Sequence, residues 1–202
     1  EGGDPGMPQV PGVDTLVRTV TDALLARGSG VVLGHDWRPK GGMDGALEAA
    51  RVLRRSGDVR HRLLHNLVPW PDRPESSDSE RRELAEVLVV ESAGLPPALA
   101  SRGDPVPSRD SEEFVYLRAR GLTWLRRRMV ELESARICMG GRIGESSGRY
   151  PGVVEEALLS LRAGHPVYIT ALLGGAAARM VAAIEDGRAP GPGFAPTRRD
   201  VV

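Results

Sequence analysis

A glycine-rich corner between an apolar run and a helical pattern carries the residues with the clearest chemistry. Residues 139–156 read MGGRIGESSGRYPGVVEE and contain five glycines, a proline and two arginines. Glycine lets a backbone approach a ligand closely, and the N-terminus of a following helix favours an anion. We expect five positions of this corner to line the site of such an anion, namely Gly140, Gly141, Arg149, Pro151 and Gly152. Pro151 opens the helix, where its missing N–H costs no hydrogen bond.

Two adjacent carboxylates, Glu155 and Glu156, close the same corner. Acidic residues are favoured in the first turn of a helix by its dipole whatever their function, so neither is assigned a catalytic role. Neighbouring residues of a helix point about 100° apart, so we expect at most one of the two to face a ligand. The offset of four residues from Gly152 favours Glu156 as the ligand-facing carboxylate.

A second corner, GHDWRPKGG at residues 34–42, lies between another apolar run and another helical pattern. Paired glycines, an arginine and a lysine there suit a phosphate, although a solvated turn explains the same composition. The positions expected to bind are Gly34, His35, Asp36, Arg38, Lys40, Gly41 and Gly42. A third pair, Gly174 and Gly175, either closes the pocket or permits close packing of the last helix.

The elements that must position these corners alternate along the chain. Short continuous apolar runs, separated by helical patterns, are typical of a parallel sheet that helices cover on both faces. We therefore expect an α/β fold, a Rossmann-like three-layer sandwich with a mostly parallel central sheet of about five to six strands. Strands are expected at residues 30–33, 60–67, 85–90, 135–139 and 167–171, and helices at 13–27, 44–55, 79–83, 111–132, 151–162 and 176–185.

Composition divides the chain into one domain with two loose ends. Residues 1–12 and 187–202 are rich in glycine and proline, which predicts a flexible N-terminal segment and a flexible C-terminal tail around a domain at residues 13–186. The 27 basic and 27 acidic residues balance, and aromatic residues make up 4%. That composition favours neither nucleic acid nor a membrane surface as a partner.

The single cysteine, Cys138, lies in an apolar run, so we expect a buried structural thiol in a cytoplasmic protein. No apolar stretch approaches the roughly 20 residues of a membrane-spanning helix. No metal site and no cofactor are predicted.

The two corners together resemble a known family. GHDWRPKGG, followed by ARICMGGRIGESSGRYPGVVEEALLSLRAGHPVYITALLGGAAA at residues 135–178, is similar to the SLOG group of Rossmann-like domains. That group includes the LOG phosphoribohydrolases and the DprA/Smf DNA-processing proteins. The LOG pattern is PGG-x-GT-x-x-E, in which glycines cradle phosphate and the glutamate contacts ribose. Here Gly140 and Gly141 match the glycine pair, and Glu155 or Glu156 matches the acid.

Three departures separate this chain from the LOG enzymes. A longer loop at residues 142–150 follows the glycine pair, Pro151-Gly152 replaces Gly-Thr, and the acid is doubled. These features resemble sensor-type SLOG domains of nucleotide-signalled bacterial immunity, which are often fused to an effector such as TIR. The resemblance implies a small nucleotide-derived or ADP-ribose-like ligand, a homo-oligomer, and an effector domain outside this chain.

Three functions remain open at this point. The first is a ligand sensor in antiphage defence, and the second is an enzyme that cleaves N-glycosidic bonds in nucleotides or NAD, with Glu155 or Glu156 as the acid–base candidate. The third is a nucleic-acid module that uses the triplet Arg126-Arg127-Arg128 and the tail pair Arg198-Arg199. Three consecutive arginines spread around a helix rather than forming one basic face, so we expect a solvated helix surface there.

Overall fold

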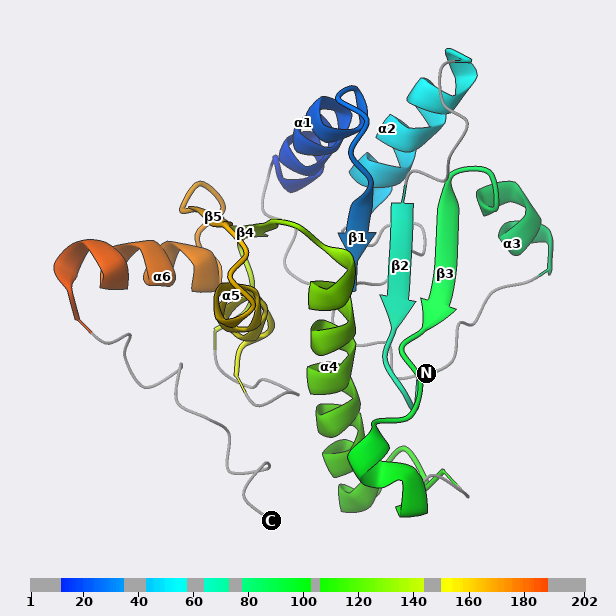
Figure 1. Ribbon diagram of the computed structural model, residues 1–202, viewed down its shortest axis with the longest axis vertical. Coiled ribbons are helices and arrows are strands. Elements are labelled where there is room, and N and C mark those ends of the chain that lie inside the picture. Colours follow the sequence, from blue (N-terminus) through cyan, green and yellow to red (C-terminus); the bar gives the residue numbers. More distant parts are fainter. Residues whose placement is uncertain are drawn as a thin grey trace. The chain divides into compact units, whose positions relative to one another are not determined.

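The computed structural model describes residues 12–34, 43–57, 64–72, 78–102, 106–143 and 150–188 (Figure 1). Helices and strands alternate along these residues and form two compact units. The elements of the first unit are α1 (Val13–Leu25), β1 (Val31–Leu33), α2 (Asp44–Arg55), β2 (Leu64–Val68), α3 (Asp78–Leu84) and β3 (Leu88–Ser92). The second unit contains Pro69–Asp72, the 3₁₀ helix η1 (Pro97–Arg102), α4 (Glu112–Leu132), β4 (Arg136–Met139), α5 (Gly152–Arg162), β5 (Val167–Thr170) and α6 (Gly175–Asp186).

The first unit is built on a three-stranded parallel sheet in the order β1-β2-β3 (Figure 1). Leu33 of β1 lies opposite Asn66 of the central strand, which lies opposite Val90 of β3. Parallel neighbours require crossover connections, and α2 and α3 supply them.

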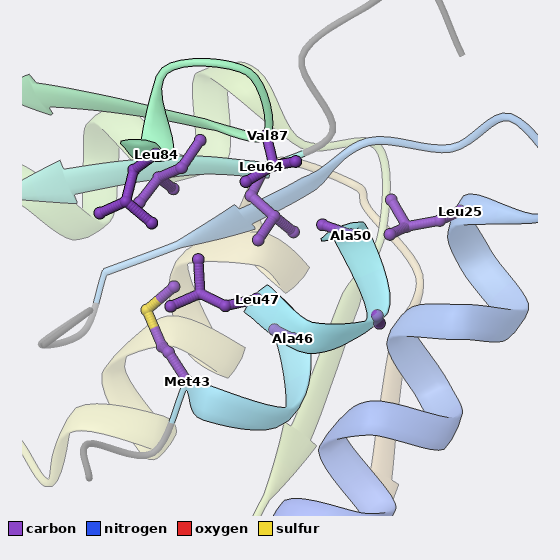
Figure 2. Close-up of a cluster of buried hydrophobic side chains, with 10 residues drawn as sticks. Leu25, Met43, Ala46, Leu47, Ala50, Leu64, Leu84 and Val87 are labelled. Carbon is purple, nitrogen blue, oxygen red and sulfur yellow. The ribbon is translucent and has the colours of Figure 1, made fainter. Parts of the chain in front are cut away.

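The core of the first unit lies between this sheet and its helices. Leu64 of β2 packs with Leu47 and Ala50 of α2, while Leu25 of α1 and Leu84 of α3 complete the cluster (Figure 2). Helix α2 turns small residues inward, which lets α1 pack closely against it. Burial of this apolar cluster holds the helices to the sheet.

The second unit contains a two-stranded parallel sheet, β4-β5, in which Cys138 lies opposite Ile169. Cys138 packs in a second apolar cluster with Val154 and Ala157 of α5 and Met180 of α6. Two helices therefore share one small core with these strands: α5 follows β4 in the chain after residues 140–151, and α6 follows β5 after residues 171–174.

Helix α4 anchors the second unit. Its first turn is capped by the hydroxyl of Ser111, which accepts a hydrogen bond from the amide of Phe114 at 3.1 Å. The segment Pro69–Asp72 lies against this helix, because Arg118 pairs with Asp72 at 3.0 Å and Gly121 sits beneath the carbonyl of Trp70.

The predicted α/β class, the alternation of helices with strands and the parallel strands are confirmed. Within the described residues there are five strands, and they are divided between a sheet of three and a sheet of two. The third strand is shifted from the expected residues 85–90 to Leu88–Ser92, because the amide of Val87 bonds back to Leu84 in a turn. Among the helices described, none is both long enough and apolar enough to cross a membrane.

Replacement of Gly121 by alanine is expected to destabilise the protein strongly. A Cβ at this position would lie 1.8 Å from the carbonyl oxygen of Trp70, so backbone must move. We expect a loss of about 3 kcal/mol, which lowers the melting temperature by roughly 6–12 °C in thermal unfolding. Alanine is otherwise the better helix former by about 1 kcal/mol, so a Gly121→Ala protein as stable as the wild type would contradict this packing. Arg127→Ala, at an exposed position of the same helix, is the control and should stay within about 0.5 kcal/mol.

Candidate ligand-binding site

The carboxyl ends of β4 and β5 bring two of the predicted glycine pairs together. Met139 lies opposite Thr170, so Gly140-Gly141 and the turn that precedes α6 leave the sheet at the same edge. The carbonyls of the first pair accept hydrogen bonds from α6: Ala177 donates to Gly140 at 2.8 Å and Ala176 to Gly141 at 3.0 Å. The first turn of α6 is therefore bound to the loop that follows β4.

Glycine is required on both sides of this contact. A Cβ on Gly175 would lie 2.3 Å from the carbonyl oxygen of Gly141. Gly141 itself has φ +88°, and a Cβ there would lie 2.7 Å from the side chain of Val153. Of the two roles considered for Gly174-Gly175, Gly175 thus serves close packing of α6. A contribution of the pair to closing a pocket stays a prediction.

Helix α5 begins at Gly152, with Pro151 as its N-cap. The first turn of a helix leaves its amides without intrahelical acceptors, and the side chain of Pro151 offers none. The amide of Glu155 bonds to the carbonyl of Pro151 at 3.0 Å, which starts the helical ladder. The amides ahead of it, at Gly152, Val153 and Val154, precede this ladder; the first of them belongs to a residue that the sequence predicted to contact an anion.

Arg126 of α4 brings a guanidinium group to this helix start. Its Nη2 atom lies 3.0 Å from the position that a Cβ on Gly152 would occupy. Only 9% of the side chain is exposed, and within the described part of the chain its Nε makes no hydrogen bond. The prediction of a solvated surface for the arginine triplet is therefore wrong for Arg126. It holds for Arg127, which is exposed, and Arg128 pairs with Glu131.

The two glutamates of α5 have different surroundings. Glu155 is buried, and both of its oxygens are engaged: Oε2 accepts from Arg126 Nη1 and Oε1 from the hydroxyl of Thr123 at 2.7 Å. Glu156 is 24% exposed and accepts from Arg136 Nη1 at 3.3 Å. Glu155 thus faces α4, and the assignment of Glu156 as the ligand-facing carboxylate stays a prediction.

Charged side chains also surround Cys138, which is buried as expected. Its thiol has a pKa raised to about 12, mainly by burial and also by the carboxylate of Glu156, while Arg136 opposes the change. A thiol with this pKa stays protonated at neutral pH, so Cys138 is a packing residue and no nucleophile.

Of the other predicted positions, those of the first corner and Arg149, the structure describes only Gly34. Gly34 follows β1 and is half-buried. The remaining residues of the first corner, namely His35, Asp36, Arg38, Lys40, Gly41 and Gly42, lie outside the described residues, as does Arg149. Their contacts with a ligand stay predictions.

Three polar residues of this site were missed from the sequence: Thr123, Arg126 and Arg136. A signal existed for Arg126, which stands four residues after Leu122 and three before Met129 and so lies on the apolar face of α4. An arginine within such a stripe needs a buried carboxylate as its partner.

The fold and this corner define a class of protein: a Rossmann-like domain with a glycine-rich strand-to-helix corner. The family model SLOG cluster2 matches residues 15–192, so the chain belongs to the SLOG family. In general, domains of this family are sensors of nucleotide-derived ligands. Neither the comparison with curated proteins nor that with solved structures gives a match.

The thiol of Cys138 is expected to resist modification in the folded protein. Its raised pKa of about 12 and its burial leave almost no accessible thiolate at pH 8. With a disulfide reagent such as DTNB, we expect negligible reaction of the native protein over an incubation of about one hour. In 6 M guanidinium, we expect one equivalent of thiol to react. Rapid reaction of the native protein at pH 8 would contradict the burial of this side chain.

Removal of one partner from the Arg126–Glu155 pair is expected to cost more than removal of both. Arg126→Met leaves a buried carboxylate without its cation, and such changes typically cost about 3–5 kcal/mol. In thermal unfolding we expect Arg126→Met to be much less stable than Arg126→Met/Glu155→Gln, while Arg127→Met stays near the wild type. Equal stability of the single and double variants would show that the pair is not coupled.

Proposed function

We propose that this domain is a sensor that binds a nucleotide or an ADP-ribose-like molecule at the carboxyl edge of β4, with a phosphate at the N-terminus of α5. Helix starts attract phosphate because their free amides point at it and the dipole adds about half a positive charge. The resemblance to sensor-type SLOG domains and the membership in the SLOG family both support a nucleotide-derived ligand.

The guanidinium of Arg126 is the observation that carries this proposal. Its Nη2 lies against Gly152, and within the described residues its Nε makes no hydrogen bond, with Glu156 Oε1 beyond hydrogen-bond distance at 3.8 Å. A buried donor without a partner is costly, and an anionic oxygen is its best acceptor. A cation held at a helix start, beside Gly152, is suited to a small phosphate group rather than to a nucleic-acid polymer.

The same contacts favour binding over hydrolysis. A catalytic carboxylate must be free to take or give a proton, whereas Glu155 accepts from Arg126 and Thr123 and Glu156 accepts from Arg136. An N-glycosidase of the LOG type is therefore the second candidate and is treated as an outcome of the test.

We further propose that ligand binding regulates an effector, fused or separate, through a homo-oligomer in antiviral signalling.

Thermal shift with ADP-ribose, NAD and AMP tests the proposed site. We expect at least one of these to raise the melting temperature of the wild type, with no release of base on chromatography. In Arg126→Gln/Glu155→Gln, which removes the charge of both partners, we expect binding to weaken by about tenfold or more, because a hydrogen bond to a charged group contributes roughly 1.5–3 kcal/mol. Arg127→Gln, one position away and exposed, should bind like the wild type.

Two results would contradict the sensor. Release of base from NAD or AMP that is lost in Glu156→Gln would make the domain a hydrolase. No stabilisation by any of the three compounds at low salt would remove the nucleotide ligand from the account altogether.

A further inference from the structure

A line of charged side chains runs along α5, from the first turn of this helix to the residues that follow its C-terminus. The line begins at Arg126, whose Nε lies 3.8 Å from Glu156 Oε1. Glu156 Oε2 accepts from Arg136 Nη1 at 3.3 Å, and Arg136 pairs in turn with Glu133 at the C-cap of α4. The line ends at His165, whose Nδ1 lies 3.8 Å from Glu133 Oε1. Opposite charges therefore alternate from Arg126 to Glu133, and a protonated His165 continues the alternation.

Ser160 fixes the far end of this line. Its hydroxyl contacts the carboxylate of Glu133 and the carbonyl of Glu156, the latter at 3.0 Å. The amide of His165 donates to the carbonyl of Ser160 at 3.0 Å, which holds the histidine beside the last turn of α5. Eight residues of helix separate Gly152 from Ser160, so the helix start and the serine that lies beside His165 are about 12 Å apart.

The charges of this cluster do not balance while His165 is neutral. Arg126 and Arg136 face three carboxylates, those of Glu133, Glu155 and Glu156, and all of these side chains except Glu156 are at most 9% exposed. Buried charge without compensation is costly. The Nδ1 atom of His165 is buried, points at Glu133 and makes no hydrogen bond among the described residues. Histidine is the side chain whose charge changes most readily between pH 5 and 8.

We infer that His165 takes up a proton from solvent when a phosphate-bearing anion binds at the N-terminus of α5, so that ligand binding is coupled to pH. The inference rests on the proposed function, which places the anion there. It adds a regulatory residue, His165, at the end of α5 opposite to the ligand. Binding of the anion by the helix start and Arg126 does not by itself require this residue.

The coupling passes along the ion pairs. An anion at Gly152 shares the guanidinium of Arg126, which weakens the hold of Arg126 on Glu156. Arg136 then interacts more strongly with Glu156 and less strongly with Glu133, so part of the neutralisation of the Glu133 carboxylate is lost. A protonated His165 restores it by donating from Nδ1 to Glu133. By reciprocity, protonation of His165 strengthens anion binding by the same factor.

The expected effect is modest and measurable. Opposite unit charges about 12 Å apart change an affinity by about twofold at the dielectric constant of water and by about tenfold at an effective value of about 20, so an intermediate change of about threefold is expected. We therefore expect ADP-ribose to bind the wild type about threefold more tightly at pH 5.5 than at pH 8. ADP-ribose is the chosen probe because its phosphates stay fully ionised over this range, unlike the terminal phosphate of AMP, which titrates near pH 6.

Titration calorimetry of ADP-ribose at both pH values, in buffers of different ionisation enthalpy, measures affinity and proton uptake together. We expect His165→Gln to abolish the uptake and flatten the affinity, while still binding ADP-ribose. His65→Gln is the matched control: His65 also pairs with one glutamate, Glu91 at 3.0 Å, and is similarly exposed at 26%. It should keep the wild-type pH dependence. Glu133→Gln, which breaks the line in the middle, should behave like His165→Gln.

The outcomes separate this inference from the proposed function. Binding of ADP-ribose without proton uptake, or with equal uptake in wild type and His165→Gln, overturns the role of His165 and leaves the sensor intact. Absence of binding to the wild type at every pH overturns the proposed function and the inference with it. Melting temperatures of each variant without ligand identify any loss of binding that comes from unfolding.

Discussion

The buried ion pair between Arg126 and Glu155 is the interaction on which the second unit of this SLOG domain depends. A guanidinium beneath the surface of α4 must meet a carboxylate, and Glu155 of α5 supplies it with the help of Thr123. The pair fixes how the start of α5 lies against α4. It also places Nη2 of the arginine beside Gly152, while its Nε makes no hydrogen bond among the described residues. A residue that the fold needs is therefore also suited to bind an anion.

Backbone contacts connect the loop after β4 to both α6 and α5. The carbonyls of Gly140 and Gly141 accept from the first turn of α6, and Gly141 packs on Val153 of α5. The amides at the start of α6 are therefore used within the protein, whereas the start of α5 faces a guanidinium instead of an acceptor. This difference explains why two helices that begin at the same sheet edge are unequal candidates for a phosphate.

Local patterns predicted most of these elements; a local turn shifted β3, and long-range partners account for the other errors. The α/β class and the glycine corner follow from short apolar runs and from residue types, which act locally. The division of five strands into two sheets depends on pairing between distant segments, which β1 and β4, with three and four residues, barely encode. Arg126 was misplaced because arginine is usually exposed. Its burial follows from Glu155, 29 residues away.

Amide hydrogen exchange with and without ADP-ribose tests the central claim most directly, since it locates the ligand on the backbone. Binding at the start of α5 is expected to slow exchange at Gly152, Val153 and Val154, whose amides the intrahelical ladder leaves free. Binding that leaves these three amides unchanged, and protects other segments alone, would contradict the account.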